Sequence, residues 1–320
     1  MINKRKIAVS DIFLSYGFYI LFVAMIIVCS FISPVFMTAA NITQVFWGAT
    51  TLMVVAAAGT LVIITGNMDM SVGSTALCCC AVAAYAKNHG AGFAQMVPLI
   101  FAVGLAIGIV NGVLVTYVKL NSMLATLGMM ILLRGISLNM TNGGAQTSLP
   151  GEFKQVANIR IGGIGILIIL SVIILLVFQF VLARTGFGAY CYAIGNHEES
   201  AKRIGLPIRK VKMAVYVISG VCAAFVGFVT CCKLGTYSGT IGNEMEFDVV
   251  TVCVMGGTSL LGGRGNVFPG TLMGVLLLYL INNILALTGA SPYIYPFAKG
   301  IVIFAAMYVD ALKNFRKRQN

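Results

Sequence analysis

The feature that most limits the fold of this chain is a series of apolar runs that recurs from Gly17 to Met307. Each run is about as long as the ~20 residues that an α-helix needs to cross a bilayer. Open sheets are excluded in lipid, and the runs lack the strict alternation of barrel strands. Because 59% of the residues are hydrophobic and only 9% are charged, the sequence predicts an all-α polytopic membrane protein.

The apolar runs predict about ten transmembrane helices. They cover residues 14–33, 45–65, 69–86, 97–117, 123–140, 164–183, 212–232, 248–262, 267–287 and 294–311. The weakest is 248–262, which is short and glycine-rich, and eight helices remain if neither it nor 69–86 crosses. Five predicted helices lie on each side of the loop 141–163, and an odd number per half indicates two inverted five-helix halves. Asp69 and Asp248 begin the third and eighth helices.

Basic residues orient these helices, because Lys and Arg are retained in cytoplasmic loops. With both termini cytoplasmic, most of the 21 Lys and Arg residues lie on the inner side. The outer side receives Lys87, Lys154, Arg160 and Lys233. The net charge of +12 does not indicate nucleic-acid binding, since the charges lie at the ends of apolar segments. The prediction is a multi-pass protein of the cytoplasmic (inner) membrane, embedded in the lipid bilayer.

A long basic segment, residues 184–212, separates two of the predicted helices. A connection between helices needs only a few residues, so this segment is expected to have a role of its own in the cytoplasm. The run EESAKR predicts a short helix, and Gly205, Leu206 and Pro207 follow it. This pattern indicates a docking element for a cytoplasmic partner.

The sequence lacks the motifs of common catalytic sites. It contains no G-x-x-x-x-G-K-[ST], no H-E-x-x-H and no G-x-S-x-G. Its nine cysteines lie almost entirely in apolar segments, without metal-ligand spacing and without a disulfide framework. We therefore predict a chain that is not an enzyme and that binds no metal and no cofactor.

Two glycine-rich stretches, 66–74 and 256–265, interrupt the apolar pattern. They indicate either broken helices that expose backbone groups to a polar solute, or close packing and helix starts, with Asp69 or Ser71 as the cap. Gly104, Gly108 and Gly112 are spaced four apart, which is typical of close helix packing.

Polar side chains inside the predicted helices are candidates for a translocation path. Arg134 is costly in mid-membrane, so it is either functional, paired with an acid or turned to the interface. Asn111 and Asn282 offer groups for a solute, or for hydrogen bonds between helices. The candidate path residues are Asn67, Asp69, Ser71, Asn111, Thr126, Arg134, Ser259 and Asn282.

Four segments together resemble one known family. They are GNMDMSVGS (66–74), NGVLVTYVKLNSMLATLGMMILLRGISL (111–138), RTGFGAYCYAIGNHEESAKRIGLPIRKVK (184–212) and VMGGTSLLGGRGNVFPGTLMGVLLLYLINN (254–283). In this order they are similar to the permease subunits of bacterial ABC sugar importers, of the ribose/xylose/arabinose/galactoside type. The chain has Asn67-Met68-Asp69-Met70-Ser71 where the family usually has Gly-Ile-Asp-Leu-Ser, a difference that bears on the identity of the sugar.

The resemblance implies one transmembrane permease domain over 1–320, with residues 184–212 as its ATPase-coupling loop. It further implies a second permease subunit, alike or unlike, ABC ATPase subunits that consume the ATP, and an extracytoplasmic sugar-binding protein. The coupling residues it implies are Gly195, Glu198, Glu199, Ala201, Gly205 and Arg209. The expected cargo is a monosaccharide such as a pentose. Nucleosides or another small solute are the alternative cargo, and ion-coupled transport is the alternative mechanism.

Overall fold

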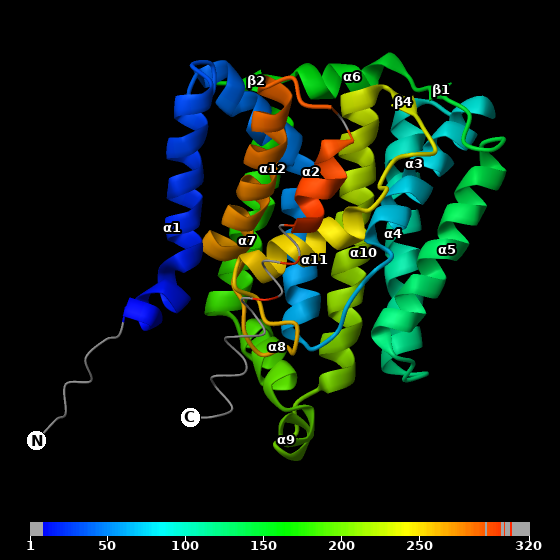
Figure 1. Cartoon of the computed structure of the whole chain (residues 1–320). Helices are drawn as coiled ribbons and strands as arrows, with labels where there is room; N and C mark the ends of the chain where they lie inside the picture. The colour runs from blue at the N-terminus through cyan, green and yellow to red at the C-terminus, as the bar shows by residue number, and fades with distance from the viewer. Residues whose placement is uncertain (1–8, 292, 302–303, 305–307, 309–320) are drawn as a thin grey trace, which may run out of the picture. The chain divides into compact units, whose positions relative to one another are not determined.

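A computed structural model describes residues 9–291, 293–301, 304 and 308 of the chain (Figure 1). The α-helices are α1 (Val9–Ile32), α2 (Ala39–Ile64), α3 (Val72–Asn88), α4 (Phe93–Thr116), α5 (Ser122–Met140), α6 (Gly151–Asn158), α7 (Ile166–Arg184), α8 (Gly186–Asn196), α9 (Glu198–Arg203), α10 (Ile208–Leu234), α11 (Met245–Met255) and α12 (Leu272–Leu287). A π-helical turn, η1 (Val267–Thr271), precedes α12. The strands are β1 (Thr147–Ser148), β2 (Arg160–Ile161), β3 (Ile164–Gly165) and β4 (Thr236–Tyr237).

Six helices of the described residues are long and apolar enough to cross a membrane: α2, α4, α5, α7, α10 and η1 with α12. They correspond to the predicted spans 45–65, 97–117, 123–140, 164–183, 212–232 and 267–287. The structure thus confirms a mainly helical polytopic chain, but the predicted count of about ten helices is not confirmed.

Two of the remaining predicted spans are shorter in the structure than a full crossing. α3, in the span predicted over 69–86, has 17 residues, or about 26 Å at 1.5 Å per residue. α11 has 11 residues, about 16 Å, so the span predicted over 248–262 is wrong as one full-length helix. The helix α11 ends at Met255, where the glycine-rich loop of residues 256–265 begins. The helix α1 has 24 residues, about 36 Å, and covers most of the span predicted over 14–33. The span predicted over 294–311 lies partly outside the described residues.

The described residues divide into two compact units. Unit 1 contains residues of 1–45 and 276–320, and unit 2 is Phe46–Val275. In unit 1, Cys29, Phe36, Val45 and Leu280 form a buried apolar cluster. Asn283 and Asn41 exchange two side-chain hydrogen bonds of 3.0 and 2.8 Å, so Asn283 holds two helices together.

Unit 2 is built on close packing of α4 against α10. A Cβ added at Gly108 would lie 2.7 Å from the Tyr216 carbonyl oxygen, and one added at Gly220 would lie 2.8 Å from the Gly108 Cα. Gly104 and Gly112 likewise face α10, at Gly220 and Met213. The prediction that this glycine stripe packs two helices is confirmed.

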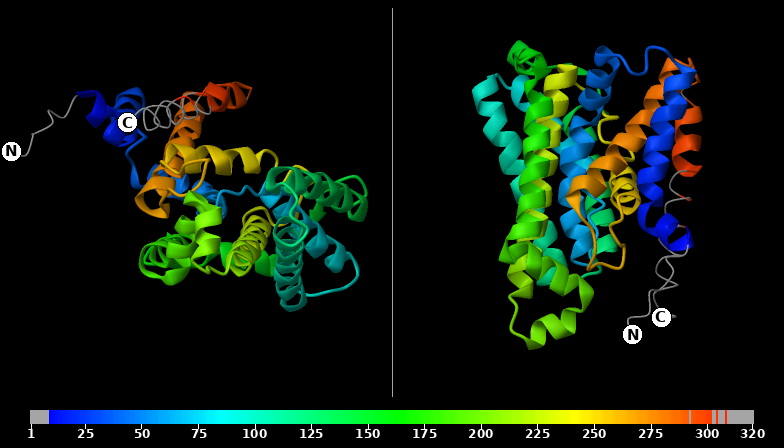
Figure 2. Two further views of the ribbon diagram at one scale, coloured as in Figure 1. Left: turned by 90° about the horizontal axis from the view of Figure 1, so that it is seen from below. Right: turned by 90° about the vertical axis from the view of Figure 1, so that its left-hand side faces the viewer.

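The two ends of unit 2 differ in structure. At one end lie α6 and the strands β1 and β4, which pair through Thr147↔Tyr237 and Ser148↔Thr236. At the other end lie α8 and α9, as the right-hand view of Figure 2 also shows. The loop 141–163 and the segment 184–212 are therefore at opposite ends of the spanning helices, as their predicted locations on opposite sides of the membrane require.

Candidate functional site

The chain between α2 and α3 is not helical, and side chains from other helices satisfy its backbone. Gly66 has φ +76°, a left-handed conformation that favours glycine and ends α2. The Met68 amide donates to Ser122 Oγ at 3.2 Å and the Met70 amide to Thr126 Oγ1 at 2.9 Å. Two residues of α5 thus replace the hydrogen bonds that a continuous helix would make. This helix break, residues 65–71, is the first part of the candidate site.

A partly buried hydrogen-bond network surrounds the carboxylate of Asp69. Its Oδ1 accepts from the amide and the hydroxyl of Ser71 at 3.0 and 2.7 Å, and its Oδ2 accepts from Ser219 Oγ at 2.7 Å. Asn111 Nδ2 donates to Ser71 Oγ at 2.8 Å, and Tyr216 Oη donates to the Met68 carbonyl at 3.0 Å. The helix break is therefore joined to α4, α5 and α10.

Five of the predicted path residues come together here: Asn67, Asp69, Ser71, Asn111 and Thr126. Asn67 Nδ2 donates to the carbonyl and hydroxyl of Thr65, both at 3.0 Å. Of the two expected caps of α3, Asp69 or Ser71, Ser71 occupies the N-cap position but its side chain makes no cap hydrogen bond. Asp69 instead accepts from the Ser71 amide. Asn111 is 1% exposed, and its Oδ1 has no hydrogen-bond partner among the described residues, so it can accept one more donor.

Two residues of this network, Tyr216 and Ser219, were not predicted from the sequence. They lie three residues apart on α10, so their side chains share one helix face. That spacing was the available signal. A third missed residue is Glu246 in the first turn of α11, which is 4% exposed. A Cβ on Gly73 would lie 2.8 Å from Glu246 Oε2, so α3 and α11 approach closely only because residue 73 is glycine.

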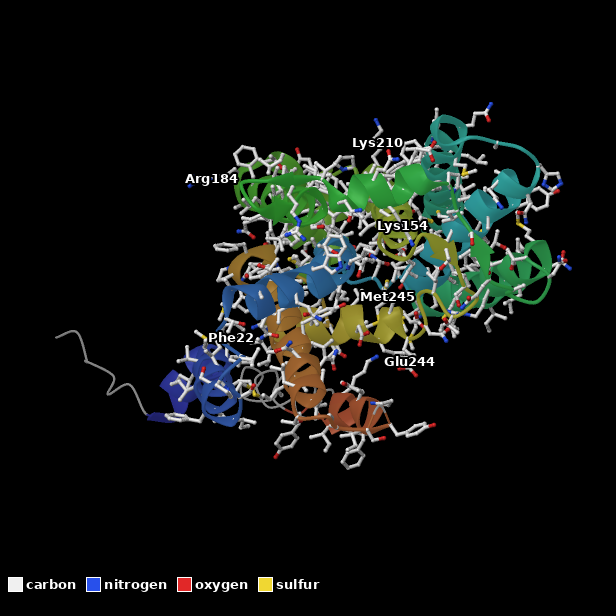
Figure 3. The ribbon with its side chains drawn as sticks, turned by 90° about the horizontal axis from the view of Figure 1, so that it is seen from above. Phe22, Lys154, Arg184, Lys210, Glu244 and Met245 are labelled. Carbon is white, nitrogen blue, oxygen red and sulfur yellow. The ribbon has the colours of Figure 1, made fainter. Side chains whose placement is uncertain are left out.

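Arg134 does not share the Asp69 network. Its guanidinium donates to the side-chain oxygen of Asn243 and to the Gly242 carbonyl at 3.4 Å. These residues precede α11, which begins at Met245 (labelled in Figure 3). Along α5, Arg134 is eight residues from Thr126, about 12 Å. Arg134 therefore holds the start of α11 to α5.

The glycine loop 256–265 is folded back on itself. The Ser259 amide donates to the Arg264 carbonyl at 2.9 Å, and Ser259 Oγ accepts from the Leu261 amide at 3.3 Å. The Gly263 amide donates to the Ile64 carbonyl, the last residue of α2, at 2.8 Å. The loop therefore contacts the start of the helix break. Asn282, the remaining predicted path residue, lies half-buried on α12 in unit 1.

The segment EESAKR forms α9 as predicted. His197 is its N-cap, and Nδ1 accepts from the Ser200 amide at 3.2 Å. At the other end of α9, the Leu206 amide donates to the Ala201 carbonyl at 3.1 Å, and the Gly205 amide donates to the Lys202 carbonyl at 3.0 Å. Gly205 has φ +77°. This is a Schellman motif, which needs a residue that tolerates left-handed φ.

The predicted coupling residues of α9 divide by exposure. Glu198 and Glu199 are exposed and Ala201 is buried. Glu198 forms an ion pair of 2.7 Å with Lys212 of α10. Arg209 is exposed, and its guanidinium lies 5.9 Å from the centre of the Tyr117 ring.

Gly195, the last predicted coupling residue, lies in α8 where four glycines meet. A Cβ on Gly195 would overlap the Ile64 carbonyl and lie 2.6 Å from the Gly263 amide. A Cβ on Gly262 would lie 2.9 Å from both the Gly195 carbonyl and the Gly66 amide. We name Gly66, Gly195, Gly262 and Gly263 the glycine junction. Only residues without side chains permit this approach of α8, the helix break and the glycine loop.

Two side chains of α8 reinforce the glycine junction. Tyr192 Oη donates to the Gly265 carbonyl at 2.8 Å, and Asn196 Nδ2 donates to the Gly263 carbonyl at 3.3 Å. Burial, and to a smaller extent the neighbouring Cys191, raises the pKa of Tyr192, so its hydroxyl remains a donor at neutral pH. Burial also raises the pKa of the Cys191 thiol to about 12, which keeps it protonated.

Comparison with known proteins places these features in one class. Residues 41–309 match the family described as the permease component of branched-chain amino acid transport systems, and the chain belongs to this family of membrane permeases. It is 34% identical over 293 residues to the ribose import permease protein RbsC of Escherichia coli (strain K12), covering 90% of this chain and 91% of RbsC. It is 32% identical over 268 residues to the autoinducer 2 import system permease protein LsrC of Yersinia pestis (strain Pestoides F), covering 84% and 76%. No solved structure gives a significant match.

The matches confirm the resemblance drawn from the four sequence segments. The relatives are permease subunits of ABC importers, so the class is one of non-catalytic translocation subunits. Such permeases work with ATPase and binding-protein partners. The family and the apolar helices together indicate a multi-pass protein of the inner membrane.

Proposed function

We propose that this chain is the translocation subunit of an ATP-driven, binding-protein-dependent importer of a monosaccharide, a pentose or a related sugar. The observation that carries the proposal is the contact of α8 with both interruptions of the spanning helices, at the glycine junction. Similarity to permeases named for ribose and autoinducer 2 favours a sugar as the cargo. ATP is hydrolysed on separate ATPase subunits, and both termini are cytoplasmic.

The exposed surface of α9 is suited to receive the ATPase. Glu198, Glu199, Lys202 and Arg203 present charges of both signs, and Ile204 beside them is 74% exposed. A short helix with one apolar residue at its tip resembles a helix that docks into a groove. Its N-cap, the Schellman motif and the Glu198–Lys212 ion pair fix its orientation. The amide of the N-cap His197 also donates to the Ala193 carbonyl of α8 at 3.2 Å, so a push on α9 reaches α8.

Movement of α8 would reach the membrane interior through backbone contacts. Gly195 touches the end of α2, and Tyr192 and Asn196 hold the glycine loop. Displacing α8 therefore displaces the helix break and the glycine loop together. The ATPase motion would thus act on Asn67, Asp69 and Ser71, which lie in the break.

The polar groups of the path suit a hydroxyl-rich solute. A neutral sugar needs donors and acceptors, whereas a strong unpaired charge would add a desolvation cost. Asn111 Oδ1, buried and without a partner among the described residues, is an acceptor available to such a solute within unit 2. Asn282 is the corresponding candidate in unit 1, and Ser259 and Arg134 are the outlying ones.

The cargo is tested by uptake into proteoliposomes that contain this chain with the ATPase and binding protein from the same genome. ATP-dependent uptake of a pentose, without uptake of nucleosides or branched-chain amino acids, is the expected result. Uptake that depends on an ion gradient and not on ATP would overturn the mechanism. Uptake of a nucleoside alone would overturn the cargo but not the mechanism.

The coupling route is tested by two matched pairs of variants on α8. Gly195→Ala would clash at the glycine junction, whereas Gly186→Ala has no atom within 4 Å of the new Cβ. Tyr192→Phe removes the hydrogen bond to Gly265, whereas Tyr190 is 38% exposed and makes no hydrogen bond in the described part of the chain. We expect Gly195→Ala and Tyr192→Phe to lower the sugar transported per ATP hydrolysed, and Gly186→Ala and Tyr190→Phe to leave it unchanged. Equal effects within a pair would contradict the route.

A further inference from the structure

The hairpin formed by β2 and β3 carries an exposed cluster of isoleucines. Ile159, Ile161 and Ile164 are 47, 58 and 49% exposed, and the exposed Arg160 lies between the first two. These residues stand in the loop between α6 and α7, at the end of unit 2 opposite α8 and α9. Nothing in the importer mechanism uses them.

The two strands of this hairpin pair with each other. Arg160 pairs with Gly165 and Ile161 with Ile164, and the Ile166 amide donates to the Ile159 carbonyl at 2.9 Å. Gly162 and Gly163, with φ +58° and +83°, form the tight turn for which two positive φ values are required. The hairpin is a two-stranded sheet, so its two outer edges stay open, and open edges do not occur within the hydrocarbon core. Its backbone therefore suits the hydrated lipid boundary, from which the isoleucine side chains can reach the acyl chains.

The position of the hairpin along the membrane normal follows from α7. β3 runs directly into α7, whose 19 residues span about 28 Å, close to the ~30 Å hydrocarbon thickness. The other end of α7 is Arg184 (labelled in Figure 3). If Arg184 lies at the inner boundary, Ile164 lies at the outer one.

Trp47 gives a second marker of this depth. A Cβ on Gly165 would lie 3.5 Å from the Trp47 ring, and Lys233 Nζ lies 5.1 Å from the centre of that ring. Tryptophan is enriched at membrane–water interfaces, where basic side chains also extend toward the headgroups. The hairpin therefore packs beside a Trp–Lys pair typical of the interface.

The neighbouring helix α6 has the opposite character. Its Phe153 is fully buried, and its exposed side chains include Glu152, Lys154 (labelled in Figure 3) and Gln155. One short loop thus presents a polar helix and an apolar hairpin side by side. A transient protein partner suits the polar helix, whereas three half-exposed isoleucines suit lipid.

We propose that the β2–β3 hairpin, residues 159–165, inserts into the outer lipid boundary of the bilayer and anchors the outer end of α7. The isoleucines enter the upper acyl-chain region, and Arg160 faces the lipid phosphates. α6 then faces water and is the surface left for the binding protein. The proposal depends on the chain spanning a membrane, and not on its cargo.

Site-directed spin labels test this placement in the assembled importer in phosphatidylcholine nanodiscs. The nine native cysteines are buried, so a new surface cysteine is labelled selectively. We expect the label of Ile161→Cys to be more accessible to oxygen than to a water-soluble nickel chelate. The label of the matched control Gln155→Cys, on α6, should show the opposite preference.

Three results would overturn the proposal. The first is preferential access of the nickel chelate to position 161. The second is protection of position 161 only when the binding protein is added, which would make the hairpin a docking surface. The third is equal lipid exposure at both positions. If Ile161→Cys does not assemble with the ATPase, Ile164→Cys gives the same comparison.

Discussion

Gly205 is the position where one side chain tests the coupling proposal most directly. Its φ is +77°, and an added Cβ would have no atom within 4 Å. A substitution therefore strains the turn without a clash inside the chain. A residue with a Cβ costs about 1–2 kcal/mol in this left-handed conformation, whereas Asn adopts it more readily.

The size of the effect follows from that strain. A change of 1–2 kcal/mol alters the folded-to-unfolded ratio by about 5–30-fold, and α9 has only six residues to oppose it. The α9 conformation competent for docking should therefore become rarer by up to that factor in Gly205→Val. Gly205→Ala should behave similarly, and Gly205→Asn should remain closer to wild type.

The assay is a titration of the ATPase onto the permease in nanodiscs, followed by ATP-dependent uptake with the same variants. The expected order of ATPase affinity is Gly, Asn, Ala and Val, with equal amounts of each variant in the membrane. Wild-type affinity and uptake for Gly205→Val would refute the role of the turn. If Gly205→Asn were as weak as Gly205→Val, the cause would be a side-chain clash with the ATPase.

Three further predictions concern other parts of the chain. Gly220→Ala should lower the thermal stability of the detergent-solubilised protein, because the added methyl group meets the backbone of α4. Gly135→Ala, on the open surface of α5, should not lower it, and equal melting temperatures of the two variants would contradict the packing argument. Cysteines at Ser148 and Ser200, both exposed, should react oppositely with an impermeant thiol reagent added outside, and equal labelling would contradict the topology. Asn111→Leu should lower the maximal uptake rate more than the apparent affinity, measured with excess binding protein; the reverse would remove Asn111 from a low-affinity path.

The sequence predicted the parts of the fold that depend on local patterns. Long apolar runs identify α4 and α7, because a bilayer requires about 20 apolar residues per crossing. The helix α9 was predicted to the residue from EESAKR and the following Gly205. The span over 69–86 was close to α3, which has 17 residues. The end of α11 at Met255 was not predicted, because it depends on the close contact of Gly256 with Gly270, which a sequence pattern does not show.

The candidate site was predictable only by residue type. Asn111 and Asp69 stood out as polar groups in apolar surroundings, but their connection through Ser71 is a tertiary fact. Ser219 lies 150 positions from Asp69 along the chain, and a serine in a helix is too common to mark it. The glycine junction was equally hidden, because Gly66, Gly195 and Gly262 meet only after three separate segments have packed.

The two kinds of contact at the helix break differ in how readily they can change. Five side-chain hydrogen bonds join residues 68–71 to α4, α5 and α10, and each contributes about 1 kcal/mol net. Such bonds can be exchanged one at a time for bonds to water or to a sugar hydroxyl. The glycine junction has backbone in contact with backbone, where packed groups have no alternative partners. We therefore expect the break to follow α8 as one body and to move against α4, α5 and α10, so that the bonds of Asp69 and Asn111 are the ones exchanged during transport.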